Sequence, residues 1–252
     1  MLLAIDVGNT NTVLGLFDDD VLERSWRIKT DARETADEIE LKFQGLLANA
    51  PEVSGIALCS TVPSVLREMR TMLDRYYAEI PRVIVEPGIK TGVGVKTDNP
   101  REVGADRIVN SLAAFTLYGG PCIVVDFGTS TNLDVVSGAG EFIGGALAPG
   151  IEISIDALAS RAAQLRKVEI VAPKHAIGKN TVEALQSGAV FGFAGQVDGL
   201  VARIQDELGA PTSAVVATGG LAGIVVPHAR SITHHEPDLT LIGLRLMFER
   251  NQ

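Results

Sequence analysis

The same pattern of eight residues occurs twice in this chain, at a spacing close to half its length. Residues 5–12 read Ile-Asp-Val-Gly-Asn-Thr-Asn-Thr, and residues 125–132 read Val-Asp-Phe-Gly-Thr-Ser-Thr-Asn. Each copy has an apolar residue, an Asp, a second apolar residue, a Gly and four small polar residues. Asp6 and Asp126 lie 120 positions apart in a chain of 252 residues. A repeat on this scale predicts two similar subdomains rather than a solenoid of short units.

The elements around the two copies follow the same order. Strands are predicted at 2–7, 13–17 and 21–28 before a helix at 35–49, and again at 123–126, 133–136 and 141–147 before a helix at 151–164. Further strands are predicted at 55–59, 82–85 and 214–217, and further helices at 63–77, 103–118, 181–208 and 239–250. We therefore expect an α/β fold with two subdomains, each a mixed sheet flanked by helices. Gly119-Gly120-Pro121 ends a helix between the copies, which places the subdomains at 1–118 and 119–252.

The composition argues against several classes of function. The net charge is −9 and no basic stripe is found, so a nucleic-acid partner is not expected. No apolar stretch approaches about 18 residues, so no membrane span is expected. The first residues read as a strand rather than a signal peptide, and Cys59 and Cys122 lie in apolar runs typical of buried core residues. With no disulfide framework, we expect a cytoplasmic protein.

A strand that ends in Asp-x-Gly and turns through Asn and Thr can hold phosphate. Gly lets the backbone approach an anion closely, and successive N–H groups of the turn form an anion-binding concavity. Asp6 and Asp126 would act through a cation, because a carboxylate repels phosphate. One such loop could equally be an ordinary turn after a strand. Two copies at half-chain spacing favour two loops that together hold a triphosphate.

A third loop follows the strand predicted at 214–217, where Thr218 precedes Gly219 and Gly220. Two glycines permit flat contact between the backbone and a nucleoside. Alone, they would indicate only a left-handed turn. After two phosphate loops, they predict the adenosine contact.

Six ordered blocks make this chain similar to type III pantothenate kinases. They are NPREVGADR (99–107), DFGT (126–129), GGALAPG (144–150), GKNT (178–181), ATGG (217–220) and LTLIGL (239–244). The order of the three loops also resembles acetate and sugar kinases, heat-shock chaperone ATPases and actin. The resemblance covers essentially the whole chain. It implies a duplicated ribonuclease H-like fold of the actin and hexokinase type, and phosphorylation of pantothenate by ATP as the first step of coenzyme A biosynthesis.

The resemblance also implies roles for individual residues. Asp106 would accept the proton of the pantothenate hydroxyl, although a carboxylate there would also suit a helix N-terminus. The pantothenate contacts that it implies are Gly104, Ala105, Asp106 and Arg107. The ATP contacts that it implies are Asp6, Val7, Gly8, Asn9, Thr10, Asn11, Thr12, Val13 and Thr129, beside Gly219 and Gly220.

Cations and a second subunit follow from the same resemblance. Asp126 would hold a monovalent cation, K⁺ or NH₄⁺, and Asp6 would act on Mg²⁺ indirectly. Thr181 would complete the pantothenate pocket of the neighbouring subunit, which implies a homodimer with the substrate site at the interface. The glycines of the helix at 181–208 suit close approach of a partner helix, or else weaken a helix packed within its own domain.

Departures from the family pattern leave two alternatives open. Thr97 stands where many members carry an aromatic residue, and Arg166 stands where a Pro is common, so walls of the pantothenate pocket could differ. The chain could then phosphorylate another small hydroxy acid, or serve as a catalytically weak or non-catalytic regulatory protein on the same fold. The presence of Asp6, Asp106 and Asp126 favours the pantothenate kinase.

Overall fold

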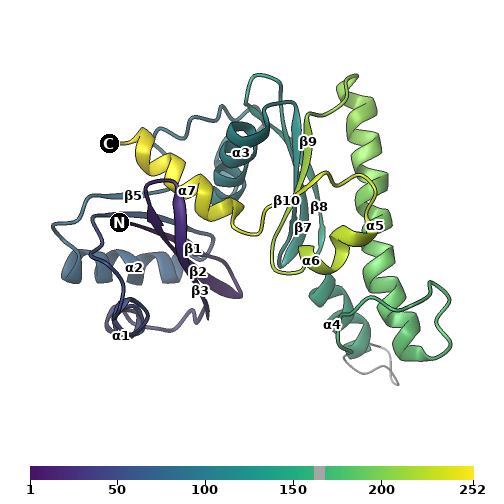
Figure 1. Cartoon of the computed structure of the whole chain (residues 1–252), viewed down its shortest axis with the longest axis horizontal. Helices are drawn as coiled ribbons and strands as arrows, with labels where there is room; N and C mark the ends of the chain where they lie inside the picture. Colours follow the sequence, from purple (N-terminus) through teal and green to yellow (C-terminus); the bar gives the residue numbers. More distant parts are fainter. Residues whose placement is uncertain (162–167) are drawn as a thin grey trace. The chain divides into compact units, whose positions relative to one another are not determined.

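Two sheets with the same strand order confirm the internal repeat. The structure, a computed structural model, describes residues 1–161 and 168–252 (Figure 1). Within these residues, one five-stranded sheet has the order β3-β2-β1-β4-β5, and the other, read from its far edge, has the order β8-β7-β6-β9-β10. In both, three antiparallel strands are extended by two parallel ones. The predicted mixed sheets are therefore present.

The first sheet carries helices on both faces. Its strands are β1 (Leu2–Val7), β2 (Asn11–Asp18), β3 (Val21–Lys29), β4 (Gly55–Ser60) and β5 (Arg82–Ile84). Helices α1 (Ala36–Leu47) and α2 (Pro63–Tyr76) pack against Leu3, Ile5 and Val7 of β1. Because successive strand residues point to opposite faces, Asp6 lies on the other face. A capping box between Thr35 and Glu38 begins α1, and Pro63 begins α2.

The face that carries Asp6 is covered by the last helix of the chain, α7 (Leu239–Arg250). Gly15 of β2 leaves room for Leu241, since a Cβ at Gly15 would come within 2.7 Å of it. Gly55 of β4 leaves room for Phe248 in the same way, at 2.4 Å. Helix α3 (Ala105–Tyr118) follows a short 3₁₀ turn, η1 (Pro100–Glu102), and Thr240 Oγ1 of α7 donates a hydrogen bond to Asn110 Oδ1 of α3 at 2.8 Å.

The second sheet is covered on one face by three helices. Its strands are β6 (Cys122–Phe127), β7 (Ser130–Val136), β8 (Phe142–Pro149), β9 (Ala214–Thr218) and β10 (His234–His235). Helices α4 (Ile151–Arg161), α5 (Thr181–Leu208) and α6 (Ala222–Val225) pack on the face that carries Ile123, Val125 and Phe127 (Figure 1). A 3₁₀ turn, η2 (Val226–His228), follows α6. Asp126 is on the opposite face.

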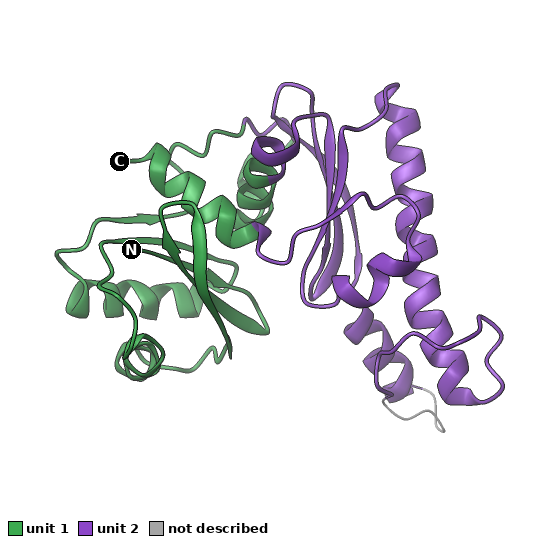
Figure 2. Cartoon of the chain, in the orientation of Figure 1, with its two compact units in different colours: residues 1–93, 98–113, 240–252 green, residues 94–97, 114–239 purple. Residues whose placement is uncertain are grey.

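The chain forms two compact units that are not continuous halves. The first contains residues 1–93, 98–113 and 240–252, and the second contains 94–97 and 114–239 (Figure 2). The predicted division between residues 118 and 119 stays a prediction. The two units differ from it in that residues 240–252, which include most of α7, belong to the first unit, because α7 packs on the first sheet. The Gln164-Leu165-Arg166 segment lies outside the described residues. No helix in the described parts of the chain is both long and apolar enough to cross a membrane.

Candidate active site

Asp6 lies in the middle of the first sheet, between two strands that fix its position. It pairs with Val13 of β2 on one side and with Cys59 of β4 on the other. The Cys59 thiol donates a hydrogen bond to Asp6 Oδ1 at 3.2 Å. Burial raises the pKa of Asp6 to about 6; the hydrogen bond from Cys59 opposes this rise, and the nearby carboxylate of Asp106 adds to it. Asp6 and Asp106, 100 positions apart in the sequence, are therefore electrostatic neighbours.

Asp106 stands in the first turn of α3, with its carboxylate held by the helix N-terminus. The backbone N–H of Arg107 donates to Asp106 Oδ1 at 2.9 Å. Burial raises the pKa of Asp106, while the N–H and the guanidinium of Arg107 oppose the rise. Gly104 leaves space for this carboxylate, because a Cβ there would lie 2.6 Å from Asp106 Oδ1. The predicted stretch of Gly104, Ala105, Asp106 and Arg107 thus forms one local unit.

The first predicted phosphate loop is a tight connection between β1 and β2. Gly8 N donates to Asn11 O at 3.0 Å, which leaves Asn9 and Thr10 exposed at the tip. Thr10 O accepts from Thr30 N at 3.0 Å, and the Thr12 hydroxyl bonds the Thr30 hydroxyl at 2.9 Å. Val7 is buried and Val13 is half-buried, so the loop is held at both ends.

The second unit repeats this arrangement with a shorter loop. Asp126 is the penultimate residue of β6, as Asp6 is of β1, and Gly128 N donates to Ser130 O at 3.0 Å. Gly128 and Thr129 are exposed at the tip. Because this loop is one residue shorter, Asp126 pairs with Asn132, whereas Asp6 pairs with a residue one position further on.

The third loop covers the Asp126 carboxylate. Gly219 has φ +92°, and a Cβ there would lie 2.4 Å from Asp126 Oδ1 and 2.7 Å from the backbone of Phe127. Gly220, next to it, is exposed. Within the second unit, the structure therefore brings together Asp126, Gly219 and the loop of Thr129. This explains in steric terms why the third loop carries a Gly at position 219.

Thr181 lies at the start of α5 and is exposed. Asn180 caps this helix, with Oδ1 accepting from Glu183 N at 3.0 Å, and Glu183 Oε2 in turn accepts from Lys179 N at 2.8 Å. The GKNT block therefore has a structural role as a helix start. The predicted contact of Thr181 with a neighbouring subunit stays a prediction.

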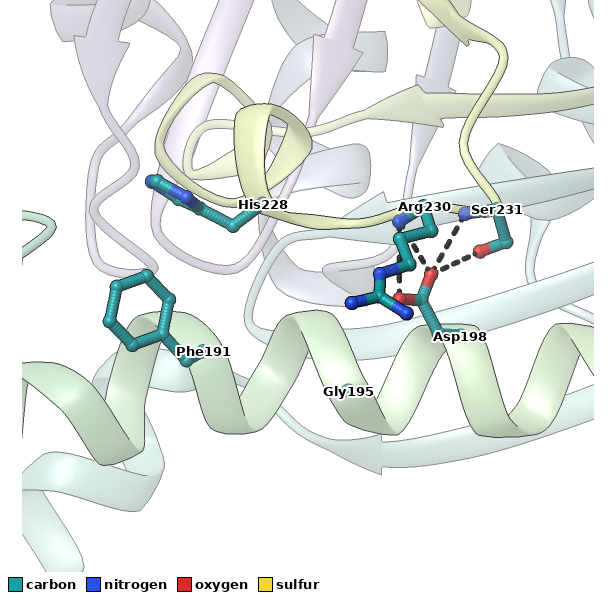
Figure 3. Close-up of a pocket in the computed structure, with 6 residues that line it drawn as sticks. All are labelled: Phe191, Gly195, Asp198, His228, Arg230 and Ser231. Atoms are coloured by element: carbon teal, nitrogen blue, oxygen red, sulfur yellow. Dashed lines mark hydrogen bonds between the residues drawn. The ribbon is translucent and has the colours of Figure 1, made fainter. Parts of the chain in front are cut away.

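A shallow pocket of about 530 Å³ lies against the middle of α5 (Figure 3). None of the predicted site residues lines it. Its lining residues are Phe191, Gly195, Asp198, His228, Arg230 and Ser231. The Asp198 carboxylate accepts hydrogen bonds from Arg230 N, Ser231 N and Ser231 Oγ at 2.7–3.1 Å (Figure 3). These bonds tie the segment after η2 to α5, which is a structural role.

The side chains fit cations bound through oxygen. Asp6 and Asp106 are like charges in a partly buried place, so a divalent cation beside Asp6 would offset their repulsion. Asp126 has the backbone at Gly219 against its carboxylate and the amide of Asn132 on the next strand. In the described residues, no group of three or more His, Cys, Asp or Glu side chains is arranged to bind a metal. The donors therefore suit Mg²⁺ shared with phosphates, and a monovalent cation, better than a transition metal.

Two residues that lie directly beside Asp6 and Asp126 in the structure were not identified from the sequence. Cys59 was expected to be only a core residue, and Asn132 only part of a polar turn. Parallel pairing of the strands at 2–7 and 55–59 would have placed Cys59 beside Asp6, but the register of two strands far apart in the sequence is not given by their composition. Asn132 is 7% exposed, and burial of an amide cannot be read from a run of Thr, Ser and Asn.

Comparison with known proteins gives one family. Residues 2–203 match the family described as type III pantothenate kinase. The chain is 67% identical to the type III pantothenate kinase of Salinispora arenicola over 252 residues, and 65% identical to that of Frankia alni over 251 residues, with 100% of each chain covered.

Solved structures agree in fold at low sequence identity. A conserved putative Baf family transcriptional activator from Campylobacter jejuni matches with a TM-score of 0.61 and 19% identity, over 99% of this chain and 98% of that one. The Lmo2764 protein of Listeria monocytogenes, a putative N-acetylmannosamine kinase, matches with a TM-score of 0.57 and 13% identity, over 98% of both chains. The expected duplicated fold of the actin and hexokinase type is confirmed. Because the family model matches residues 2–203 and the chain is 67% identical to the Salinispora arenicola protein over its full length, the chain belongs to the type III pantothenate kinase family.

Proposed function

We propose that this protein transfers the γ-phosphoryl group of ATP to the hydroxyl of pantothenate, giving 4′-phosphopantothenate. The observation that carries the proposal is that Asp106 and Asp6 lie in the same unit of a type III pantothenate kinase family member, with the Asp106 carboxylate near enough to raise the pKa of Asp6. One carboxylate can then accept a proton while the other acts on the cation that accompanies ATP. The product is the first intermediate on the route to coenzyme A.

Asp106 has the features of a modest general base. It is partly buried, and burial raises its pKa, which increases its affinity for a proton. It would accept the proton of the pantothenate hydroxyl as that oxygen bonds to the γ-phosphorus and ADP departs. Arg107, next to it, presents a guanidinium whose fork suits the pantothenate carboxylate or a phosphate oxygen. Gly104 keeps the base in position by leaving room for its carboxylate.

The remaining predicted residues would bind ATP and its cations. The first loop is exposed at Asn9 and Thr10 and the second at Thr129, and these loops would bind phosphate. Gly219 and Gly220 would contact adenosine. Mg²⁺, when bound, would neutralise charge that develops on the phosphates. Asp6 would orient its water shell, and Asp126 would hold K⁺ or NH₄⁺.

A homodimer is part of this proposal, and α5 offers a surface for it. Gly188, Gly192, Gly195 and Gly199 recur at helical spacing on this helix, are exposed, and would have nothing within 4 Å of an added Cβ. They lie opposite the face that carries the core residues Val190, Val197 and Val201. Such a stripe allows close approach of a second α5, and Thr181 at the start of the same helix would then reach the pantothenate pocket of the partner. We expect the dimer to function in the cytoplasm.

Thr97 supplies the observation for a second candidate, a kinase for another small hydroxy acid. Its hydroxyl oxygen is buried and has no hydrogen-bond partner among the residues that the structure describes. A polar group in place of an aromatic wall could favour a smaller or more polar acceptor. Family membership favours pantothenate, and acceptor competition separates the two candidates.

The test is release of ADP by the purified protein with ATP and Mg²⁺, with pantothenate or pantoate as acceptor, and with K⁺ or tetramethylammonium. We expect turnover only with pantothenate and K⁺ together. Asp106→Asn should lower kcat by about 10²- to 10⁴-fold while calorimetry shows that ATP binding is kept. Faster turnover with pantoate would favour the second candidate, and no turnover from a folded dimer would favour a regulatory protein. Normal turnover by Asp106→Asn would show that another group is the base.

A further inference from the structure

The side-chain oxygen of Asn132 is buried without a partner in the protein. Asn132, on β7, is 7% exposed, and its Oδ1 accepts no hydrogen bond from any residue that the structure describes. An amide oxygen buried in this way loses its hydration and gains nothing in return, which costs about 1–3 kcal/mol. Most such groups in native proteins have a partner, and a bound ion or water is a common one. The oxygen therefore calls for a partner from outside the chain.

The strand register places this oxygen next to Asp126. Asn132 pairs directly with Asp126 across the antiparallel strands β7 and β6, and Thr218 of β9 pairs with Asp126 from the other side. Paired residues point to the same face, with Cβ atoms about 5 Å apart. The three side chains form a row across the sheet, at the end where the second and third loops lie.

The equivalent row of the first unit is different. There Asp6 has Val13 and Cys59 as its neighbours in the same two positions. A valine can offer no ligand to a cation, so the amide is a property of the second unit alone. The duplicated fold thus keeps the central Asp in both sheets but adds an oxygen donor beside only one of them.

The neighbours of this oxygen suit a cation of low charge. Gly219 brings the backbone against Asp126, where a Cβ would lie 2.4 Å from Oδ1. The donors in reach are a carboxylate and neutral oxygens of amide type, which suit hard cations. Among these, K⁺ is commonly held by carbonyl oxygens that replace its hydration shell.

We propose that Asn132 Oδ1 is a ligand of the monovalent cation at Asp126. This inference rests on the proposed function, which places a K⁺ or NH₄⁺ ion at Asp126. It adds a second side chain to that site and makes the identity of residue 132 a determinant of how tightly the cation is held.

The test uses thermal unfolding of the dimer without nucleotide, in K⁺ and in tetramethylammonium at equal ionic strength. The wild type should gain stability from K⁺. Asn132→Leu should be more stable than the wild type without K⁺, because an unpaired buried amide has been removed, and its affinity for K⁺ should fall at least about tenfold. Asn132→Asp, which keeps an oxygen at the position, should retain the response to K⁺. Binding of Tl⁺ followed by thallium NMR gives the affinity directly.

Thr131→Val is the matched control. Thr131 is 0% exposed, its Oγ1 has no partner among the described residues, and it lies on the opposite face of the same strand. It should gain stability without K⁺ and keep the full K⁺ response. An equal response to K⁺ in Asn132→Leu and the wild type would overturn the inference alone, with phosphorylation of pantothenate intact. A wild type that phosphorylates pantothenate with no response to K⁺ would overturn the cation site and the role of Asn132 together.

Discussion

The thiol of Cys59 donates a hydrogen bond to Asp6 Oδ1 at 3.2 Å, across the paired strands β4 and β1. Burial raises the pKa of this thiol, with the carboxylates of Asp6 and Asp106 adding to the effect, so Cys59 stays protonated and remains a donor. One oxygen of Asp6 is thereby held in place by a side chain that is itself fully buried. A residue expected to serve only the core thus orients a carboxylate of the site.

Cys59→Ala should lower the apparent affinity of the enzyme for Mg²⁺. Loss of the donor frees the Asp6 carboxylate to rotate, and the Mg²⁺ concentration for half-maximal activity should rise about tenfold. Cys59→Ser should restore most of the loss, because a hydroxyl also donates. Cys122→Ala, at the other buried cysteine, is the control for a cavity of the same size. Equal Mg²⁺ dependence in Cys59→Ala and Cys122→Ala would contradict the role of the hydrogen bond.

Asp6 should make the ligand-free protein less stable as the pH rises. The pKa of Asp6 is about 6 in the folded protein against 3.8 ordinarily, so the folded state binds the proton more tightly and loses stability between about pH 4 and pH 6. Asp6→Asn removes this penalty. It should be more stable than the wild type by about 3 kcal/mol at pH 8, and the difference should vanish near pH 4. Urea unfolding at several pH values measures it.

Asp31→Asn provides a control of opposite sign for that pH series. The pKa of Asp31 is lowered by hydrogen bonds from Arg33, so the wild type should hold an advantage at neutral pH that is lost as the pH falls. If Asp6→Asn showed the same pH dependence as Asp31→Asn, the raised pKa of Asp6 would be refuted.

Gly104→Ala should damage catalysis more than folding. The added Cβ would lie 2.6 Å from Asp106 Oδ1, and the carboxylate must move away from the backbone N–H of Arg107. A displacement of about 1 Å can lower kcat about 100-fold, while the KM for ATP and the unfolding midpoint should change little. Gly45→Ala, with nothing within 4 Å of the new Cβ, should keep full activity. Unchanged kcat in Gly104→Ala would mean that Asp106 does not need its observed position.

Gly192→Leu should weaken the proposed dimer. A leucine on the exposed glycine stripe of α5 would keep a second helix at a distance, with an expected rise of at least about tenfold in the dimer dissociation constant. Activity should fall with the dimer fraction, because Thr181 of the partner would be withdrawn from the pocket. Analytical ultracentrifugation measures the association, and Gly45→Leu in α1 controls for added apolar surface. A fully dimeric Gly192→Leu would place the interface elsewhere.

The sequence predicted the regular elements well because their signals are local. Short continuous apolar runs that lead to an Asp predicted β1 and its counterpart β6, and the repeat of Asp6 and Asp126 predicted two sheets that turned out to share one strand order. The short elements α6, η2 and β10 were not predicted, because two to four residues carry no measurable periodicity. The packing of α7 on the first sheet depends on small residues such as Gly15 that lie far from it in the sequence.

The site was predicted less completely because its contacts join distant strands. The resemblance to a family named Asp106, and the structure places it near enough to Asp6 to raise the pKa of that carboxyl, but the roles of both stay predictions. The bond from Cys59 to Asp6 and the pairing of Asn132 with Asp126 follow from register, which depends on the whole sheet. Asn132 is buried on the face opposite α4, α5 and α6, and the composition of one strand does not reveal burial on that face.

The most direct test of the central claim is the identity of the phosphorylated product. The purified protein, supplied with ATP, Mg²⁺, K⁺ and pantothenate, should yield 4′-phosphopantothenate by mass spectrometry, with one ADP formed for each molecule of product. Formation of ADP with free phosphate and no phosphorylated pantothenate, or no ADP at all, would contradict the account.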